Sequence, residues 1–351
     1  MSWEDYSAEQ NKKNPFENHA CGFRQGKEYQ IIMEKTEIPV IDVIIPAYRP
    51  DDSFHKLIRL LLEQSVKPHH IYVLQTIEDG EQVLQPLDQR MSVHPVPKKE
   101  FDHGATRDYG AGLAVKDIGD DISQHYILFM TQDAVPAGTE LLERLVKPFG
   151  DDRTAITYAR QLAREEADLL ERLTRVHNYP PEDQVKSKED LERLGIKTYF
   201  CSDVCAMYRL DRYMEQGGFV HPTIFNEDMI MASRMIQAGY QVVYCGSAEV
   251  FHSHNYSCMQ QFHRNFDLGV SQKQYREVFE SISSEKEGAG YAKSTLLYLL
   301  KRGKPGKAFY FALQCGFKLI GYKLGKNYDH LPRKMVLWCT MTPGYVCLLY
   351  T

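Results

Sequence analysis

Short apolar runs alternate with amphipathic stretches along most of the chain. Residues 38–48 and 70–74 are rich in β-branched and aromatic residues, and between them, in residues 51–64, apolar residues recur at helical spacing. Continuous apolar runs are typical of buried parallel strands, and helical spacing is typical of a helix that covers them. This stretch of about 35 residues therefore predicts a strand, a helix and a second parallel strand, with Asp51 and Asp52 capping the helix.

The same patterns predict an α/β fold in which helices flank a mostly parallel, twisted sheet. Gly239 marks the end of a helix expected at residues 229–238, because glycine readily adopts the left-handed conformation that follows a helix. The other strands or extended segments are expected at residues 93–96, 126–130, 154–158, 198–208, 241–244 and 249–251, and the other regular helices at residues 140–149, 159–177, 184–193 and 209–215.

Composition is that of an ordinary soluble globular protein, with 43% hydrophobic and 25% charged residues. The net charge of -5 gives no overall attraction to nucleic acid, so we expect no such partner. The eight cysteines are scattered without a CxxC pair, which argues against a zinc ribbon and fits reduced cytoplasmic thiols. The first residues are polar, so we expect no signal peptide, and no apolar run reaches the ~18 residues of a membrane-spanning helix.

Positive charge is concentrated at the C-terminal end. From residue 291 the chain is predicted to be helical, and residues 289–351 hold ten lysines and arginines but a single acid, Asp329, interleaved with aromatic residues. Such a segment suits an anionic lipid surface. The alternative is a pair of helices whose aromatic residues pack on the rest of the protein while the cations are solvated.

One carboxylate stands just after the apolar run at residues 126–130. Asp133 lies in a turn that Pro136 and Gly138 close. A lone acid at the carboxyl edge of an α/β sheet is placed to hold a hard metal ion beside a phosphate. In the alternative interpretation, Asp133 only caps a helix that starts near Thr139.

A glycine-rich segment offers a site for phosphate groups. Gly104, Gly110 and Gly112 open a helix of small residues, and His103 and Arg107 stand at its start. Backbone N–H groups at a helix N-terminus, assisted by a cation, can hold a diphosphate. The alternative is a helix whose glycines let it pack closely on the sheet, and the two interpretations are compatible.

Two further polar groups lie late in the chain. Glu227 and Asp228 stand at the first turn of the helix 229–238, where acids also interact favourably with the helix dipole. His252 and His254 directly follow the last expected strand. They are either ligands for a metal or a phosphate or a pair of histidines in a surface loop.

The order of these motifs resembles that of inverting glycosyltransferases of family 2 with the GT-A fold, and among them bacterial rhamnosyltransferases. Each motif alone is weak, but the collinear order is specific and covers roughly residues 38–266, with a weaker likeness at 322–328. The motifs are Val-Ile-Ile-Pro-Ala-Tyr at 43–48, Glu-Phe-Asp-His-Gly-Ala-Thr-Arg at 100–107, Thr-Gln-Asp-Ala at 131–134, Arg-Gln-Leu at 160–162 with Asn-Tyr-Pro at 178–180, Gly-Gly-Phe at 217–219, Asn-Glu-Asp at 226–228 and His-Ser-His-Asn-Tyr-Ser at 252–257.

The resemblance implies a division of the chain into three parts. A catalytic domain at residues 38–266 would lie between an N-terminal extension, residues 1–37, and a basic helical region, residues 267–351. Within the catalytic domain, residues 38–135 would bind the nucleotide and residues 136–266 the acceptor.

The resemblance also implies roles for the late polar groups. A divalent ion, Mg²⁺ or Mn²⁺, would be held by Asp133 and His252, with Asp133 as its only carboxylate and with weak binding in the absence of nucleotide. His254 would orient His252 or contact phosphate or acceptor. Asp228 would be the base that deprotonates the acceptor hydroxyl, and Glu227 would place the acceptor.

The nucleotide sugar is expected across the first βαβ unit, beyond the strand ends. Many relatives carry an aspartate after the second strand, whereas this chain has Gln75 and Thr76, so the base, thymine or uracil, stays open. Asp203 stands where relatives often carry asparagine, which leaves the acceptor contact open. The residues expected at the donor are Pro46, Ala47, Tyr48, Arg49, Gln75, Thr76, His103, Gly104, Arg107, Gln132 and Asp133, and those expected at the acceptor are Ser202, Asp203 and His254.

We therefore expect a metal-dependent inverting glycosyltransferase that moves rhamnose from dTDP-rhamnose onto a growing, polyprenyl-diphosphate-linked bacterial cell-surface polysaccharide. Such an acceptor would place a cytoplasmic protein peripherally on the inner face of the plasma membrane. One alternative is a family 2 transferase with a UDP-hexose donor. Others are a nucleotidyltransferase, which would need a glycine-rich phosphate loop directly after the first strand, and a non-catalytic sugar-nucleotide-binding module, which would not need the pair Glu227 and Asp228.

Overall fold

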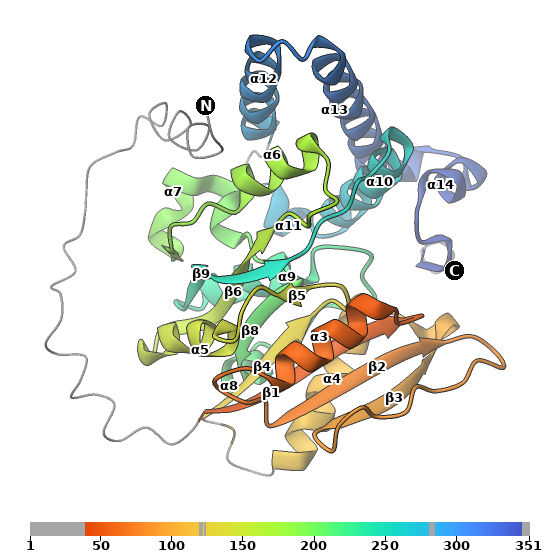
Figure 1. Ribbon diagram of the computed structural model, residues 1–351. Helices are drawn as coiled ribbons and strands as arrows, with labels where there is room; N and C mark the ends of the chain where they lie inside the picture. The colour runs from red at the N-terminus through yellow and green to blue at the C-terminus, as the bar shows by residue number, and fades with distance from the viewer. Residues whose placement is uncertain (1–38, 119–121, 123, 281–284, 346–351) are drawn as a thin grey trace, which may run out of the picture. The chain divides into compact units, whose positions relative to one another are not determined.

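One mixed β-sheet runs through the described part of the chain (Figure 1). The computed structural model describes residues 39–118, 122, 124–280 and 285–345, so the expected N-terminal extension lies outside the described residues. In these ranges nine strands pair in the order β3-β2-β1-β4-β8-β6-β9-β5, and β7 also pairs with β9. The strands are β1 (Val40–Tyr48), β2 (His70–Ile77), β3 (Met91–Pro97), β4 (His125–Met130), β5 (Val135–Pro136), β6 (Thr154–Leu162), β7 (Gln184–Lys186), β8 (Cys205–Arg209) and β9 (Gln241–Phe251).

Helices cover both faces of this sheet (Figure 1). Successive residues of a strand point to opposite faces: Val43 and Ile45 of β1 join an apolar cluster with α3, while Ile44 joins a second cluster with α4 and α9. The helices are α3 (Asp52–Leu62), α4 (His103–Ile118), α5 (Leu141–Val146), α6 (Leu169–Asn178), α7 (Leu191–Leu194), α8 (Leu210–Glu215), α9 (Glu227–Gln237), α10 (Cys258–Gln274), α11 (Arg276–Phe279), α12 (Glu285–Lys301), α13 (Pro305–Lys326) and α14 (Arg333–Cys339).

The first half of the fold confirms the prediction from the apolar runs. β1 pairs in parallel with β2 and with β4, and β2 pairs in parallel with β3. The Asp51 side chain caps α3 by accepting from the Ser53 N–H at 3.0 Å. Gly239 follows α9 with a φ of 95°, which is the left-handed conformation predicted for it. The carboxyl ends of β1, β2 and β4 therefore meet at one edge.

The second half of the sheet is less parallel than predicted. β6 pairs in parallel with β9, but β8 runs antiparallel to both β4 and β6, and β5 and β7 run antiparallel to β9. The expected strands at residues 241–244 and 249–251 form the single strand β9. A mixed sheet results, because the chain enters β8 from the edge at which β4 leaves.

Three predicted segments were wrong in type or extent. The helix expected at residues 159–177 begins only at Leu169, because residues 159–162 extend β6 and pair with β9. The helix expected at 184–193 starts as strand β7, and only residues 191–194 are α-helical. The extended segment expected at 198–208 opens with the end of a short 3-10 helix (Gly195–Tyr199). In the first two cases pairing along β9 outweighs the helical spacing of the apolar residues.

Glycines bring the C-terminal helix α13 close to α10. A Cβ at Gly321 would lie 2.2 Å from the Phe262 carbonyl oxygen, and one at Gly325 would lie 2.0 Å from the Phe266 carbonyl oxygen. From the other side, a Cβ at Gly269 would lie 2.4 Å from the Tyr322 carbonyl oxygen. Because α10 directly follows the segment with His252 and His254, this contact fixes α13 to the catalytic part of the chain. None of the helices among the described residues is long and apolar enough to cross a bilayer.

We predict opposite effects for two glycine substitutions in α13. Gly325→Ala should lower the free energy of unfolding by about 1–3 kcal/mol, because the new methyl group meets a backbone carbonyl that cannot easily move. Gly316→Ala should raise it by up to about 1 kcal/mol, since a Cβ there meets nothing within 4 Å and alanine favours a helix over glycine. Urea unfolding of both variants measures this, and equal effects would contradict the close packing.

Candidate active site

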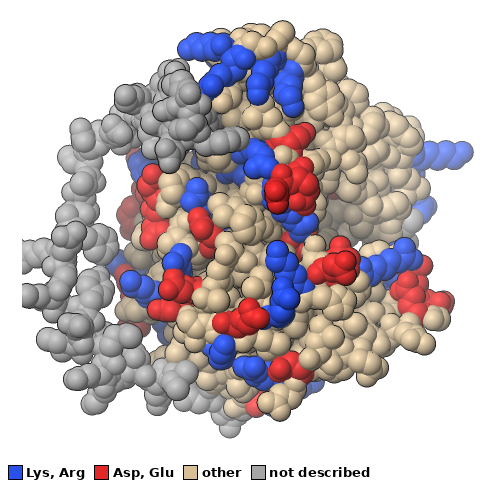
Figure 2. All heavy atoms as spheres, viewed as in Figure 1, with Lys and Arg blue, Asp and Glu red and all other residues tan. Residues whose placement is uncertain are grey.

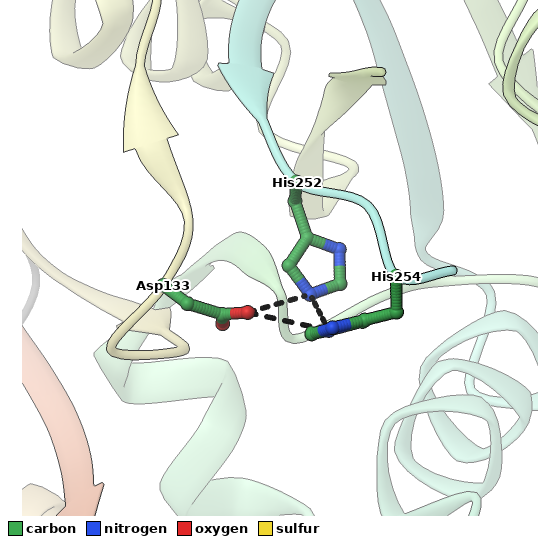
Figure 3. A group of neighbouring side chains, drawn as sticks. All are labelled: Asp133, His252 and His254. Atoms are coloured by element: carbon green, nitrogen blue, oxygen red, sulfur yellow. Dashed lines mark hydrogen bonds and ion pairs between the residues drawn. The ribbon is translucent and has the colours of Figure 1, made fainter. Parts of the chain in front are cut away.

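Three side chains from two strand ends point toward one another at the edge of the sheet (Figure 3). Asp133 follows β4, and His252 and His254 follow β9. The pairing of Val135 with Phe251, between β5 and β9, brings the two segments together. The ligand atoms of the three side chains lie within 4.8 Å of one another.

The donor atoms of this group suit a small divalent cation. His254 Nε2 lies 3.2 Å from Asp133 Oδ2, and His252 Nε2 lies 3.6 Å from the same oxygen. The two Nε2 atoms are 3.1 Å apart. Imidazole nitrogens combined with a carboxylate oxygen are common ligands of divalent transition metals. The residues present therefore fit a divalent metal ion, and we call them the Asp-His-His group.

The charges in this group also favour a metal. His252 is buried, and burial lowers its pKa to about 3. A neutral imidazole is the form that binds a metal ion. Burial by itself would raise the pKa of Asp133, but the hydrogen bond with His254 and the charges of both histidines together hold the pKa well below its usual range. Near neutral pH the group thus offers an ionised carboxylate together with a neutral buried ring.

Asp133 does not cap the following helix. The N-cap residue of α5 is Glu140, and the side chain that accepts from the first turn of that helix is Gln64, through the Leu142 N–H. The carboxylate instead faces the histidines and Arg164, whose Nη2 lies 3.7 Å from Asp133 Oδ2 and also donates to the Asp133 backbone oxygen. The sequence pattern did not single out Arg164, because the segment after β6 was predicted to be helical.

A second group contains one arginine and three acids. Arg107 Nη1 donates to Glu227 Oε1 at 2.8 Å, and Arg107 Nε lies 3.7 Å from Asp203 Oδ2. The Asp203 N–H donates to Asp228 Oδ2 at 3.3 Å. Arg107, Asp203 and Glu227 are all buried. We call these four residues the buried acid group.

Within this group one positive charge faces three carboxyl groups. Burial, together with the charge of Glu227, raises the pKa of Asp228 to about 7. Burial also raises the pKa of Asp203 well above its usual range. Asp228 Oδ1 accepts a hydrogen bond from the Met229 N–H at 2.7 Å, which fixes the carboxyl group at the first turn of α9. Asp228 can therefore exchange a proton near neutral pH, as a general base must.

The glycine-rich segment differs from its predicted role. We expected Arg107 to face the ribose or the diphosphate, but its guanidinium binds acids inside the protein. A Cβ at Gly104 would lie 2.3 Å from the Val220 carbonyl oxygen, so this glycine is needed for close packing. His103 is the first residue of α4, and burial lowers its pKa. Packing thus explains Gly104 without a bound phosphate, and a phosphate contact of His103 or Gly104 stays a prediction.

Tyr48 and Gln132 connect two strand ends. The Tyr48 N–H donates to Gln132 Oε1 at 2.7 Å, and Gln132 Nε2 donates to the Tyr48 carbonyl oxygen at 3.0 Å. This reciprocal pair ties the end of β1, which also contains Pro46 and Ala47, to the turn that carries Asp133. The expected donor residues of β1 and the Asp-His-His group therefore belong to one continuous edge.

Two charged residues that we did not predict also lie at this edge. Glu78 Oε1 accepts from the Tyr48 hydroxyl at 2.6 Å and from Lys98 Nζ at 2.6 Å. Arg49 Nη2 reaches the same oxygen at 3.4 Å. Glu78 and Lys98 directly follow β2 and β3, so their position after adjacent strands was the signal that could have found them.

Gln75 and Thr76 differ in the hydrogen bonds that their side chains make. Gln75 Nε2 donates to the Gln82 carbonyl oxygen at 3.2 Å, and its Oε1 accepts from the Leu84 N–H at 2.7 Å. Its amide thus holds the loop after β2, where we expected it to meet the base. Thr76 Oγ1 is buried and has no hydrogen-bond partner among the described residues.

Ser202 connects Asp203 of the buried acid group, its neighbour in the chain, with Gln161 beside the Asp-His-His group. Ser202 Oγ accepts from Gln161 Nε2 at 3.0 Å, and His252 Nδ1 lies 3.0 Å from Gln161 Oε1. The Asp203 carboxyl group accepts from the Tyr208 hydroxyl at 2.7 Å inside the protein. We expected Asp203 to contact the acceptor, but its side chain is buried in the acid group.

We predict that Arg107 stabilises the fold by offsetting the buried acids. Arg107→Met should lower the free energy of unfolding by about 3–5 kcal/mol, because it leaves carboxyl groups buried without a cation. The double variant Arg107→Met with Glu227→Gln should lose less than the sum of the single changes. Chemical unfolding of the three variants tests this. If Arg107→Met instead left stability unchanged and lost nucleotide affinity, that result would support the phosphate contact that we first expected.

Comparison with known proteins identifies the family. The model of glycosyl transferase family 2 matches residues 42–215. The chain is 36% identical to the O-antigen chain rhamnosyltransferase RfbN of Salmonella typhimurium, over 87% of this chain and 95% of RfbN. It is 33% identical to the O-antigen chain rhamnosyltransferase WbaN of Salmonella anatum, over 88% of this chain and 96% of WbaN.

A solved structure shares the fold. The mannosyltransferase PcManGT from Pyrobaculum calidifontis, in complex with GDP-Man and Mn²⁺, matches with a TM-score of 0.53 and 12% identity, over 84% of this chain and 89% of its own. This likeness confirms the expected GT-A-type fold. The chain belongs to glycosyl transferase family 2 and is a glycosyltransferase that is rhamnosyltransferase-like over most of its length.

Proposed function

We propose that the protein transfers rhamnose from dTDP-rhamnose, with inversion at the anomeric carbon, onto a growing lipid-linked cell-surface polysaccharide. The observation that carries this proposal is the position of Asp228, a carboxyl group with a pKa raised to about 7. Its Oδ2 accepts from the Asp203 N–H, and the neighbouring residue Ser202 is hydrogen-bonded to Gln161, which contacts His252 of the Asp-His-His group. A base and a metal-binding group at one sheet edge are what an inverting transfer from a nucleotide sugar requires. Rhamnose is favoured by the names of the relatives RfbN and WbaN.

In this mechanism Asp228 is the general base. The acceptor hydroxyl approaches the sugar on the face opposite the leaving nucleoside diphosphate. As the new C–O bond forms, the hydroxyl proton passes to Asp228, the bond to the diphosphate breaks and the configuration inverts. Hydrogen bonds from the Met229 and Asp203 N–H groups hold the two carboxyl oxygens. Glu227 accepts a hydrogen bond from Arg107. We therefore assign it to holding the buried acid group in place and not to binding the acceptor.

Asp133, His252 and His254 would hold the divalent ion. When bound, such an ion would offset the charge that develops on the diphosphate. Two imidazoles with one carboxylate suit Mn²⁺ better than Mg²⁺, which prefers oxygen ligands. Tyr48, Arg49 and Gln132, on the same edge, are placed for the nucleoside and its phosphates.

Three alternative functions fit the features of the chain less closely. A UDP-hexose donor is the alternative within the family, because Gln75 and Thr76 stand where many relatives carry the aspartate that contacts the base. A nucleotidyltransferase would need a glycine-rich phosphate loop after β1, where this chain has Tyr48, Arg49 and Pro50. A binding module without catalysis would have no use for the raised pKa of Asp228.

The activity test is nucleotide release. With Mn²⁺ and without an acceptor, the wild type should slowly hydrolyse dTDP-rhamnose to rhamnose and dTDP. UDP- and GDP-sugars should be hydrolysed more slowly, and a chelator should stop the reaction. Asp228→Asn should reduce turnover at least about 100-fold, since general bases contribute about 10²–10⁴-fold, but should retain dTDP binding by calorimetry. Because Asp228 acts when ionised, the wild-type rate should fall as pH drops below about 7.

Two outcomes would contradict this assignment. If a UDP-hexose reacted faster than dTDP-rhamnose, the assignment of rhamnose as the donor sugar would be wrong, but the proposed mechanism would still hold. Loss of dTDP binding in Asp228→Asn, with turnover reduced only in proportion, would show that Asp228 supports the fold and is not the base.

We also propose that the C-terminal helices contact an anionic membrane. Phe309, Leu313 and Ile320 lie four and seven residues apart in α13, which places them on one helix face, and they are 68%, 41% and 55% exposed. Figure 2 shows Lys and Arg side chains gathered at the top of the view, over α12 and α13. The exposed cations at the turn between these helices are Lys301, Arg302, Lys304 and Lys307. An apolar face flanked by cations suits acidic lipid headgroups, and it would hold the enzyme on the cytoplasmic face beside its acceptor.

Flotation with lipid vesicles tests this contact. The wild type should float with phosphatidylglycerol-containing vesicles and much less with phosphatidylcholine alone. Changing Phe309, Leu313 and Ile320 together to Ser should abolish flotation without changing nucleotide release. The matched control changes Leu87, Val185 and Met214 to Ser, which are 47%, 53% and 46% exposed on other parts of the chain. Equal flotation of both triple variants would contradict a specific membrane face.

A further inference from the structure

Gln161 makes an unusual set of contacts for a buried side chain. It lies in β6 and is 2% exposed. Its Oε1 accepts from Arg175 Nη1 and faces His252 Nδ1 at 3.0 Å. Its Nε2 donates to the Tyr179 hydroxyl at 2.7 Å and to Ser202 Oγ at 3.0 Å. All four contacts are to side chains, and one of them is to a residue of the Asp-His-His group.

Arg175 determines which way the Gln161 amide faces. A guanidinium group can only donate hydrogen bonds, so the atom that meets it must be the carbonyl oxygen. Arg175 itself is held by Glu171, whose Oε1 accepts from Arg175 Nε at 2.7 Å. A flipped amide would bring two donors together. The orientation of the Gln161 amide therefore follows from chemistry.

The amide orientation in turn sets the tautomer of His252. Because Gln161 Oε1 can only accept, His252 Nδ1 must carry the hydrogen and donate it. In a neutral imidazole the other nitrogen then has a free lone pair. That nitrogen, Nε2, is the one that faces Asp133 Oδ2 and His254 Nε2. The chain Glu171, Arg175 and Gln161 thus leaves the metal-facing nitrogen of His252 able to bind an ion.

We propose that Gln161 is a positioning residue that locks His252 in the tautomer and ring orientation that a divalent ion requires. The proposal rests on the proposed metal binding by the Asp-His-His group. Partners of metal-bound histidines typically change metal affinity about 10–100-fold when they are removed. Gln161 never touches the ion or the substrates in this view and acts only through His252.

Gln64 offers a matched control. It is also fully buried, and it makes three hydrogen bonds through its amide, to the Leu60 and Gly138 carbonyl oxygens and from the Leu142 N–H. All of these partners are backbone groups, and none belongs to the Asp-His-His group. Gln64→Leu therefore reports what the loss of a buried amide does to the protein in general.

The experiment measures Mn²⁺ affinity in the presence of dTDP, by electron paramagnetic resonance of free Mn²⁺, together with thermal unfolding. Gln161→Leu should weaken Mn²⁺ binding about 10–100-fold. Gln161→Glu should restore binding to within about threefold of the wild type, because a carboxylate still accepts from His252 Nδ1 and from Arg175. Gln64→Leu should lower the unfolding temperature but leave Mn²⁺ affinity unchanged.

The outcomes separate this proposal from the proposed function. Wild-type Mn²⁺ binding with the same affinity in folded Gln161→Leu would overturn the positioning role alone. Equal losses of affinity in Gln161→Leu and Gln161→Glu would also overturn it, since they would show a packing role. If Gln161→Leu does not fold, Arg175→Met frees the amide to flip and should weaken binding in the same direction; unchanged affinity there would overturn the proposal. No Mn²⁺ binding by the wild type would overturn the metal site and this proposal together.

Discussion

The ion pairing of Arg107 with Glu227 and Asp203 is the interaction on which the buried acid group depends. Three carboxyl groups would repel one another strongly inside a protein, and Arg107 offsets only part of their charge through Glu227 and Asp203. Burial, together with the charge of Glu227, raises the pKa of Asp228 to about 7. A fully compensated group would give an ordinary, weakly basic carboxylate, and an uncompensated one would not be stable. In the proposed mechanism, Arg107 thus offsets part of the cost of burying the acids beside the base, Asp228.

The pairing of β9 on both sides brings together the residues of the Asp-His-His group and their partner Gln161. Phe251, the last residue of β9, pairs with Leu162 of β6 and with Val135 of β5. The His252 N–H then donates to the Leu162 carbonyl oxygen at 2.9 Å, which fixes the histidine directly after the strand. Asp133 lies two residues before Val135, and Gln161 lies one residue before Leu162, so both are close to the residues that pair with Phe251. Ladder hydrogen bonds, which are indifferent to side chains, therefore bring together residues that are far apart in the sequence.

The sequence allowed prediction of those parts of the site that depend on strand ends. Asp133 and His252 each follow an apolar run, and the resemblance to the family implied that they are paired. The contacts of Arg107 could not be predicted in this way, because its partner Glu227 lies 120 positions away and no periodic pattern gives the direction of a side chain. Gln161 was hidden for another reason. Its segment has apolar residues at helical spacing, and only pairing with β9 makes it a strand.

The C-terminal helices are hydrogen-bonded to two segments that carry residues of the site. Gln314 of α13 donates to the Tyr256 carbonyl oxygen at 3.0 Å, only two residues after His254. In α12, the Tyr291 hydroxyl bonds to Thr174 of α6, the helix that also carries Arg175. Residue 266, the boundary expected from the resemblance, lies in the middle of α10, which packs along α13. A membrane at the outer face of α13, as proposed above, would therefore contact a helix that is joined to the segment after His254, while α12 is joined to the helix that carries Arg175.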